Sequence, residues 1–219
     1  MDATSITSII IRPVSLRVLD HPLAHHLLTG LRDRTTEPDR FRQLARVLTS
    51  LLILEATRDI PTRTEAVKTP IETTEGRVLD QTLAVVPILR AGLGMLEPAV
   101  QLFPDVAVGY IGLERHEATA VAHSYYSKMP NLAGKFTLCL DPMLATGGSA
   151  AQAISLIKTH QPAKVVMVAV VAAPEGVARL ESAHPEVDIV TAAYDRCLNE
   201  RKYIVPGLGD FGDRLYGTF

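Results

Sequence analysis

The chain has 219 residues, of which 47% are apolar and 21% are charged, with a net charge of -2 and a pI near 6.4. This is the composition of an ordinary globular protein with enough chain for one well-covered core, and we expect a single domain over residues 1–219. A nucleic-acid partner normally requires a basic surplus, which this chain lacks, so its charge favours small-molecule chemistry.

The cysteines and the apolar runs bear on where the protein resides. Cys139 and Cys197 are too few for a disulfide framework or a four-ligand metal site, and they fit a reducing cytosol. The first residues contain an acid but no basic residue before a short isoleucine run, which is wrong for a signal peptide. The longest apolar run, residues 165–173, is shorter than the roughly 20 residues that cross a bilayer. We therefore expect a cytoplasmic protein with no membrane partner.

The first part of the chain predicts a short strand and two helices. The strand is expected at residues 16–19, and a helix from Pro22, a residue suited to a first turn, to about residue 31. Thr36 resembles an N-cap followed by Pro38 and then Asp39, close to a capping box, so a long helix should run to about residue 57. Its apolar residues cover more than one narrow stripe: Phe41, Leu44, Val47, Leu48, Leu51, Leu52 and Leu54. Either part of this helix is buried against a second subunit, or all of it is buried within one subunit.

The middle of the chain predicts strands and a long loop. Residues 63–79 alternate apolar and polar positions and predict a peripheral pair of strands. Residues 82–88 predict a core strand followed by Arg90, and ligands bind at such carboxyl ends in open α/β sheets. A guanidinium there suits a di-anion such as pyrophosphate, whereas a lone arginine is more often a solvated surface residue.

A further strand is expected at residues 106–111, followed by a polar stretch without periodicity. We interpret this stretch, residues 113–130, as a mobile flap, because loops of this length inside a compact domain are either functional or disordered. It contains His116 and His123, which lack the spacing and companions of a zinc set and are better explained as solvated loop residues.

The central stretch predicts a strand, a small-residue loop and a helix. Residues 136–140 are typical of a parallel strand buried on both faces, and Pro142 ends it after Asp141 because proline lacks the N–H that a central strand requires. The loop that follows contains Ala145, Thr146, Gly147, Gly148 and Ser149. Such a loop aims backbone N–H groups and hydroxyls at one point before a helix N-terminus, which favours a phosphate. An ordinary strand-to-helix turn, with glycines that serve only packing, is the alternative.

Two better-known phosphate-binding loops are excluded. The P-loop pattern Gly-x-x-x-x-Gly-Lys-Ser/Thr is absent, as is a lysine at the helix start. Gly92-Leu93-Gly94 continues to Glu97 instead of a third glycine, so the Rossmann dinucleotide fingerprint is also absent. Asp141, by contrast, can accept hydrogen bonds from sugar hydroxyls while the loop after it holds a phosphate of the same sugar. This arrangement suits a ribose 5-phosphate.

The last part of the chain predicts two more strands and an irregular tail. Strands at residues 165–172 and 187–193, with a short helix to about residue 183 between them, complete an alternation that predicts a doubly wound parallel sheet. The glycine-rich tail, residues 203–214, has too little apolar content for a helix. Because apolar residues interleave with its glycines, we expect a structured loop there, with a frayed terminus as the alternative.

The run LDPMLATGGS, from Leu140 to Ser149, resembles the binding motif of phosphoribosyltransferases in the version found in uracil phosphoribosyltransferases. Many members of the wider superfamily carry two adjacent acids, whereas here Asp141 is followed by Pro142, as in the uracil branch. Residues 203–210, 88–92 and 55–59 are similar to this family as well, so the likeness extends along nearly the whole chain.

The resemblance implies an α/β fold with a doubly wound, mainly parallel sheet flanked by helices, a flap (hood) and a peripheral β-arm. It implies transfer of the phosphoribosyl group from phosphoribosyl pyrophosphate to uracil, forming UMP and pyrophosphate in pyrimidine salvage. The residues expected to bind phosphoribosyl pyrophosphate are Arg90, Arg115, Asp141, Pro142, Met143, Leu144, Ala145, Thr146, Gly147, Gly148, Ser149 and Asp210. Those expected to bind uracil are Ile204, Gly209, Asp210 and Phe211, and the residues expected to be catalytic are Asp141, Arg115 and Asp210.

The resemblance also implies a cofactor, an assembly and an effector. The family requires Mg²⁺, which would be held mainly through the pyrophosphate with no direct side-chain ligand. It forms homodimers or larger homo-oligomers, and in some members GTP activates the enzyme. Glu114 stands where the family often has Tyr, and the flap sequence through His123 is atypical. The resemblance therefore does not define how the flap closes.

Uracil presents a carbonyl, an N–H and a second carbonyl along one edge, and backbone groups of a glycine-rich segment can match that row while rejecting cytosine. Three alternatives remain: transfer to another base, a ligand-sensing regulator that binds RNA, and an assembly protein with a dead site. The acidic pI counts against the second. The intact set of polar ligands counts against the third.

Overall fold

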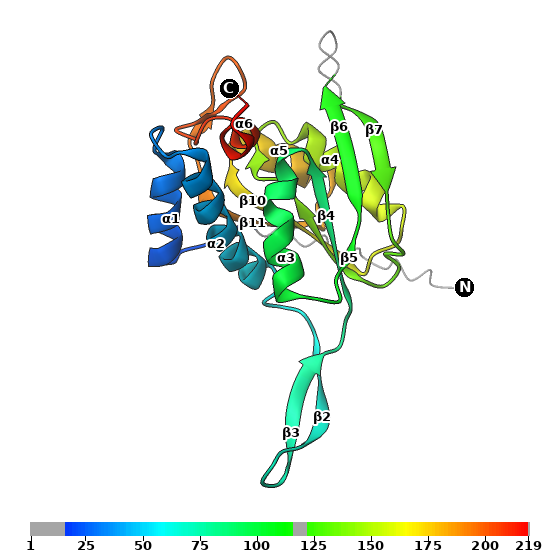
Figure 1. Cartoon of the computed structure of the whole chain (residues 1–219). Coiled ribbons are helices and arrows are strands. Elements are labelled where there is room, and N and C mark those ends of the chain that lie inside the picture. Colours follow the sequence, from blue (N-terminus) through cyan, green and yellow to red (C-terminus); the bar gives the residue numbers. More distant parts are fainter. Residues whose placement is uncertain (1–15, 116–121, 219) are drawn as a thin grey trace, which may run out of the picture.

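A mostly parallel sheet forms the centre of the fold (Figure 1). The computed structural model describes residues 16–115 and 122–218 of the chain. The strand order is β1-β11-β10-β8-β4-β6-β7, with the short β5 beside β4 and the short β9 beside β10. The strands are β1 Leu16–Val18, β4 Leu83–Leu89, β5 Ala107–Val108, β6 Tyr110–Arg115, β7 Ala122–Lys128, β8 Phe136–Leu140, β9 Met143–Leu144, β10 Lys164–Ala172 and β11 Asp188–Tyr194. Every neighbouring pair is parallel except β6 and β7.

Helices cover both faces of the sheet, which confirms the doubly wound prediction. They are α1 Pro22–Arg32, α2 Pro38–Ala56, the 3-10 helix η1 Ala91–Met95, α3 Leu96–Leu102, α4 Gly148–Lys158, α5 Pro174–Ala183 and α6 Phe211–Tyr216. Val85 of β4 packs in a core with residues of α1, α2 and α6, whereas its neighbour Val86 packs in a second core with residues of α4 and α5. Successive side chains of a strand point to opposite faces, so a strand covered on both sides is apolar throughout.

The strand order reverses direction between β4 and β8. From β4 the chain crosses to β6 on one side, then returns to place β8 on the other side of β4. The carboxyl ends of these two strands, which precede Arg90 and Asp141, are therefore adjacent. In an open α/β sheet this reversal point is where a ligand binds.

The hairpin of β2 (Thr62–Lys68) and β3 (Thr73–Leu79) confirms the predicted peripheral pair of strands. It projects from the body of the molecule in Figure 1, and Ile71 at its turn is 92% exposed. No helix of the described residues, 16–115 and 122–218, is long and apolar enough to cross a bilayer.

Two expectations about α2 are wrong in detail. The N-cap is Glu37, without a side-chain cap bond, and the Thr36 hydroxyl instead donates to the carbonyl of Gly30 at 2.7 Å, which takes it away from the helix. Complete burial of the helix within one subunit is also wrong, since Val47 and Leu54 are 43% and 55% exposed.

The stretch interpreted as a mobile flap, residues 113–130, contains the end of one strand and the whole of the next. β6 reaches Arg115 and β7 begins at Ala122, and the two pair antiparallel. The strand expected at residues 106–111 is divided into β5 and β6, because the chain passes Gly109, whose N–H donates to the carbonyl of Val85. His116 and the residues from there to position 121 lie outside the described part, so the prediction about His116 is untested.

The tail is ordered, as expected, but it contains a helix that the sequence did not predict. β13 (Ile204–Val205) pairs antiparallel with β12 (Cys197–Leu198), and the chain then enters α6. Asp210 caps α6 by accepting a hydrogen bond from the Asp213 N–H at 2.9 Å. Phe211 is 1% exposed and packs edge-on against Phe41 with ring centroids 5.1 Å apart, so burial in the core stabilises a helix of only six residues.

Candidate active site

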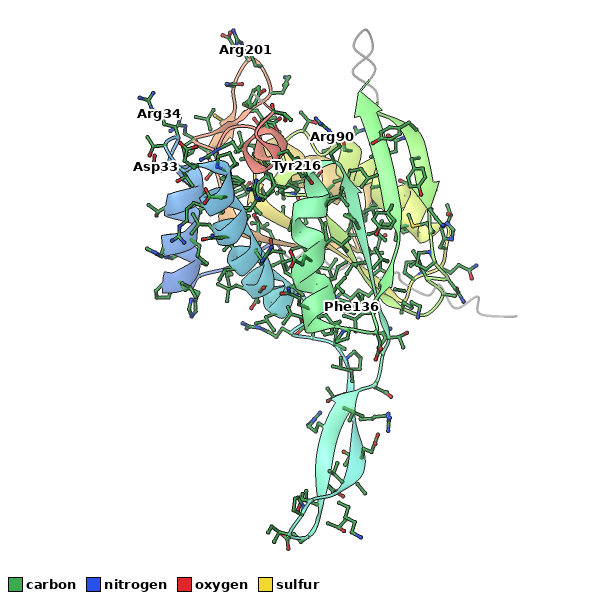
Figure 2. The ribbon with its side chains drawn as sticks, in the orientation of Figure 1. Asp33, Arg34, Arg90, Phe136, Arg201 and Tyr216 are labelled. Carbon is green, nitrogen blue, oxygen red and sulfur yellow. The ribbon has the colours of Figure 1, made fainter. Side chains whose placement is uncertain are left out.

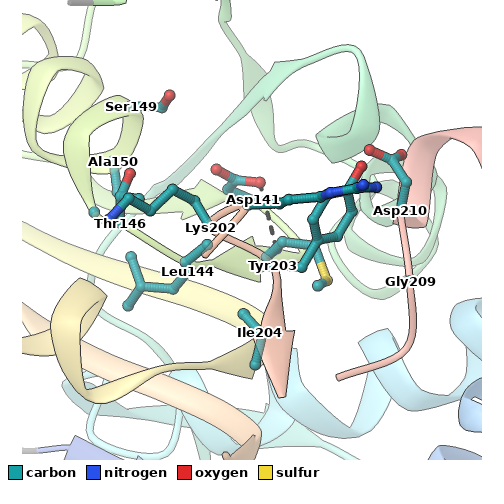
Figure 3. A pocket seen from close by; sticks show the side chains of 14 residues that line it. Asp141, Leu144, Thr146, Ser149, Ala150, Lys202, Tyr203, Ile204, Gly209 and Asp210 are labelled. Carbon is teal, nitrogen blue, oxygen red and sulfur yellow. Dashed lines mark hydrogen bonds between the residues drawn. The ribbon is translucent and has the colours of Figure 1, made fainter. Parts of the chain in front are cut away.

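A cavity of about 360 Å³ lies at the carboxyl edge of the sheet (Figure 3). It is lined by Asp141, Met143, Leu144, Ala145, Thr146, Gly147, Ser149, Ala150, Arg201, Lys202, Tyr203, Ile204, Gly209 and Asp210. The structure thus brings the loop after β8 together with the glycine-rich tail, two segments about 60 residues apart in the sequence. Such a concave site with a few convergent polar groups is the usual form of a small-molecule site.

The loop between β8 and α4 is built to approach an anion closely. Gly147 is the N-cap of α4 and has φ +74°, a left-handed conformation that glycine adopts without strain. The loop packs tightly against the start of α5, since a Cβ on Gly176 would lie 2.5 Å from the Leu144 carbonyl oxygen. The N–H groups of the first turn of α4 have no partner within the helix and lie at its positive end. This geometry favours the phosphate-site interpretation over an ordinary turn.

Asp141 follows β8 directly and is half-buried at the edge of the cavity. Its N–H donates to the Val168 carbonyl at 3.2 Å, so the residue is held in line with the neighbouring strand β10. Its carboxylate accepts a long contact of 3.4 Å from the Met143 N–H, the bond drawn in Figure 3. Cys139 is fully buried, and burial, followed by the Asp141 charge, raises the pKa of its thiol. It therefore stays a thiol and is no nucleophile.

Arg90 directly follows β4 and lies beside this edge without lining the cavity itself. The turn around it is pressed against β8, because a Cβ on Gly92 would lie 2.5 Å from the Leu140 carbonyl oxygen. The Leu89–Arg90 peptide is cis. The Tyr216 hydroxyl donates to the Arg90 carbonyl at 3.4 Å, and burial raises the pKa of that hydroxyl despite the opposing charge of Arg90. Figure 2 shows Arg90 and Tyr216 at the same end of the molecule.

Charged contacts from α1 and its end hold the tail in place. Arg32 donates two hydrogen bonds to the Asp195 carboxylate, at 2.6 and 2.9 Å, and one to the Gly207 carbonyl at 2.9 Å. Asp195 also accepts the Gly207 N–H at 2.8 Å and is 7% exposed. Arg214 donates to the carbonyls of Leu31 and, at 2.9 Å, Leu208. The segment expected to hold the base is therefore fixed before any ligand binds.

Some residues predicted for the site do not line the cavity. Pro142 is buried, Gly148 is half-buried, and the Phe211 side chain packs in the core, which leaves only its backbone available to a ligand. Arg115 ends β6, but its side chain lies outside the described part of the chain, so its role is untested.

Four lining residues were not predicted: Ala150, Arg201, Lys202 and Tyr203. For Arg201, Lys202 and Tyr203 the signal was the adjacent basic pair 201–202, immediately before the resemblance at residues 203–210, whereas Ala150 lies in the first turn of α4, just after the loop. They sit in the turn between β12 and β13, a hairpin that the sequence did not predict.

The described residues include no group of three or more His, Cys, Asp or Glu side chains that could hold a metal ion. Asp141 and Asp210 are the carboxylates among the residues that line the cavity. One or two carboxylates together with the phosphates of a substrate are a usual environment for Mg²⁺. This donor set therefore fits a magnesium ion that arrives with a phosphorylated ligand.

Comparison with known proteins gives consistent matches. The family model described as uracil phosphoribosyltransferase matches residues 18–218. A uracil phosphoribosyltransferase of Dictyoglomus turgidum is 49% identical over 92% of this chain and 98% of its own, and one of Campylobacter curvus is 43% identical over 93% and 99%. The structure of the AQ2163 protein from Aquifex aeolicus superposes with a TM-score of 0.87 at 42% identity, covering 92% of this chain and 97% of that one.

Proposed function

The chain belongs to the uracil phosphoribosyltransferase family, and on that premise we propose that it transfers the phosphoribosyl group of phosphoribosyl pyrophosphate to uracil, forming UMP and pyrophosphate. The observation that carries this proposal is the shared cavity of the phosphate-type loop and the glycine-rich tail. A sugar phosphate held by the loop would have its anomeric carbon facing a base held by the tail.

The reaction forms a bond from uracil N1 to the anomeric carbon and breaks the bond from that carbon to the pyrophosphate oxygen. The pyrophosphate leaves with the bonding electron pair, and the N1 proton must be lost. By analogy with other glycosyl transfers, the sugar should pass through an oxocarbenium-like state. The protein then contributes mainly positioning and charge stabilisation.

We assign the phosphoribosyl pyrophosphate to one wall of the cavity. Thr146, Ser149 and the N–H groups at the start of α4 would bind the 5-phosphate, and Asp141 would accept hydrogen bonds from the ribose hydroxyls. Arg90, at the neighbouring strand end, would bind the pyrophosphate, because a guanidinium can donate two parallel bonds to it. Arg115, on the strand that leads into the flap, would help exclude water from the activated sugar.

We assign uracil to the opposite wall. Ile204 is 4% exposed and offers an apolar surface, while the backbone from Gly209 to Phe211 offers N–H and carbonyl groups for the edge of the base. Asp210 is the candidate for contact with both substrates. Its Oδ1 atom already accepts the Asp213 N–H, so Oδ2 is the atom left for a substrate or for the N1 proton.

Mg²⁺ would be held mainly through the pyrophosphate, near Asp141 and Asp210. When bound, it would neutralise charge on the leaving group. GTP activation, assembly into dimers or larger oligomers and a cytoplasmic location, all implied by the family resemblance, are part of this proposal. The exposed apolar residues Val47 and Leu54 of α2 support an assembly.

The test is formation of UMP from phosphoribosyl pyrophosphate with uracil, compared with xanthine, hypoxanthine and orotate, in the presence and absence of Mg²⁺. We expect UMP from uracil and no nucleotide from the other bases. Preference for another base would show a phosphoribosyltransferase of different specificity. Asp141→Asn should weaken the use of phosphoribosyl pyrophosphate and Arg115→Ala should lower turnover, and unchanged kinetics in both variants would remove the site assignment.

A further inference from the structure

The turn between β12 and β13 carries a lysine in an unusual backbone conformation. Lys202 has φ +65°, in the left-handed region that residues with a Cβ seldom adopt. Such outliers cluster at ligand-binding sites, where the surrounding structure enforces them.

The turn is held rigidly by its own hydrogen bonds. The Lys202 N–H donates to the Asn199 carbonyl at 2.9 Å, and the Asn199 N–H donates to the Tyr203 carbonyl at 2.9 Å. The Asn199 side chain accepts the N–H groups of Arg201 and Tyr203 at 3.0 and 2.9 Å. A substituent at position 202 thus has a defined starting direction.

The base of the hairpin is anchored to the helix that supports the phosphate loop. Glu175, in the first turn of α5, accepts the Leu198 N–H at 2.9 Å. That bond is the main reason why the pKa of the Glu175 carboxyl is lowered, and the charge of Lys202 adds to it. Gly176, the next residue of α5, packs on the Leu144 carbonyl of the loop. Lys202 therefore stands beside both the start of α5 and the phosphate loop.

The Lys202 side chain lies along the wall of the cavity. It lines the cavity together with Thr146, Gly147 and Ser149, and in Figure 3 it extends from the hairpin toward Thr146. The carboxylates of Asp141 and Asp210 line other parts of the same cavity. The Lys202 ammonium group, by contrast, brings positive charge to the loop of Thr146 and Ser149, where a phosphate dianion would bind.

We propose that Lys202 is a further phosphate-binding residue, whose ammonium group contacts the 5-phosphate of the phosphoribosyl ligand from the side opposite the α4 N-terminus. This inference rests on the proposed function and adds a residue outside the loop motif. The hairpin that leads into the base-binding tail thereby contacts the phosphate as well. Both ends of one nucleotide are held by a single structural unit.

The test compares ligands that differ only in the phosphate. Titration calorimetry of the full-length protein with UMP and with uridine separates the phosphate contribution from the base and ribose contributions. For Lys202→Met we expect the Kd for UMP to rise about tenfold, the effect of about one charge-assisted hydrogen bond, and the Kd for uridine to change less than about twofold. Because the contact exists in the ground state, KM for phosphoribosyl pyrophosphate should rise similarly while kcat changes little.

Three further variants make the result specific. Lys202→Arg keeps the charge and should retain UMP affinity within about threefold. Lys202→Gly removes the charge but relieves the left-handed backbone, so it should weaken UMP binding like Lys202→Met without lowering Tm. Lys68→Met, the same charge change at the end of β2 on the projecting hairpin, should leave UMP binding unchanged.

The inference is overturned if Lys202→Met and Lys202→Gly bind UMP as the wild type does, or if UMP and uridine lose affinity equally. An equal loss in Lys68→Met would show general electrostatics and would overturn it as well. Failure of the proposed function is a separate result, namely a wild-type protein that makes no UMP from uracil and phosphoribosyl pyrophosphate.

Discussion

Replacing Asp195 by alanine should both destabilise the fold and impair uracil binding. The carboxylate is 7% exposed and accepts three hydrogen bonds, two from Arg32 and one from the Gly207 N–H. Without it, the Gly207 N–H is buried without a partner and the Arg32 guanidinium keeps only the Gly207 carbonyl. The tail that follows β13 then loses its main attachment to α1.

The cost can be worked out from these contacts. Breaking a fully buried ion pair by removing one partner costs about 3–5 kcal/mol, and an unsatisfied buried N–H about 1–3 kcal/mol. The two costs count part of the same lost interaction, so they do not simply add. In addition, the Arg32 side chain is 25% exposed, so water replaces part of what it loses. We expect a loss of about 3 kcal/mol, which for a chain of this size lowers Tm by about 6–12 °C.

The matched control is Asp59→Ala. Asp59 also contacts an arginine, Arg17, at 2.9 Å, but its side chain is 60% exposed, and such surface pairs contribute about 0–1 kcal/mol. Asp195→Asn, which keeps an acceptor for the Gly207 N–H, should fall between the two. Thermal unfolding and steady-state kinetics measure both effects, and KM for uracil should rise more than KM for phosphoribosyl pyrophosphate.

The reasoning is refuted if Asp195→Ala and Asp59→Ala lower Tm by the same small amount. It is also refuted if Asp195→Ala is strongly destabilised while KM for uracil, measured well below Tm, stays at the wild-type value. In that case the attachment of the tail would have no bearing on the base.

Three further outcomes are expected. In Gly176→Ala the new Cβ would lie 2.5 Å from the Leu144 carbonyl oxygen, so the backbone must shift. We expect the variant either to lose the use of phosphoribosyl pyrophosphate or to lose its fold, and activity assays together with circular dichroism distinguish the two outcomes. Phe211→Leu should cost about 1 kcal/mol through its contact with Phe41 and leave KM for uracil unchanged in kinetic assays, because its side chain is buried in the core and only its backbone is proposed to contact the base. The hydrogen bond from the Leu198 N–H lowers the pKa of the Glu175 carboxyl in the folded protein from its usual value of 4.5. The ionised carboxylate therefore stabilises the fold above pH 4.5, and this stabilisation is lost as the pH falls through the lowered pKa. Glu175→Gln should remove this part of the pH dependence in unfolding measured from pH 6 to about pH 3.

The sheet and the loop after β8 could be predicted because their signals are local. The apolar runs at residues 136–140 and 165–172 describe strands buried on both faces, and β8 and β10 appear there. Asp141 and the small residues after it lie together in the sequence, so their chemistry could be interpreted without the fold. The position of Arg90 beside them followed from the rule for strand ends in open sheets.

The tail helix and the hairpin before it could not be predicted, because their stability comes from distant residues. α6 has six residues and includes Gly212, a composition that would not form a helix alone. It forms because Phe211 packs on Phe41 and Arg214 donates to carbonyls near the end of α1. None of these contacts leaves a periodic pattern within residues 203–214. Likewise, β6 and β7 pair in a stretch whose polar sequence resembles a loop.

The same dependence on distant contacts explains why the motif alone underestimates the site. On the proposed assignment the loop after β8 would bind the phosphate, but the opposite wall of the cavity is held in place by Asp195, Arg32 and Glu175, none of which lies in a recognised motif. Because these residues position backbone and not side chains of the tail, their effect on catalysis should be felt through KM for uracil. We therefore expect substrate selection to depend on the Arg32–Asp195 ion pair, although neither residue lines the cavity.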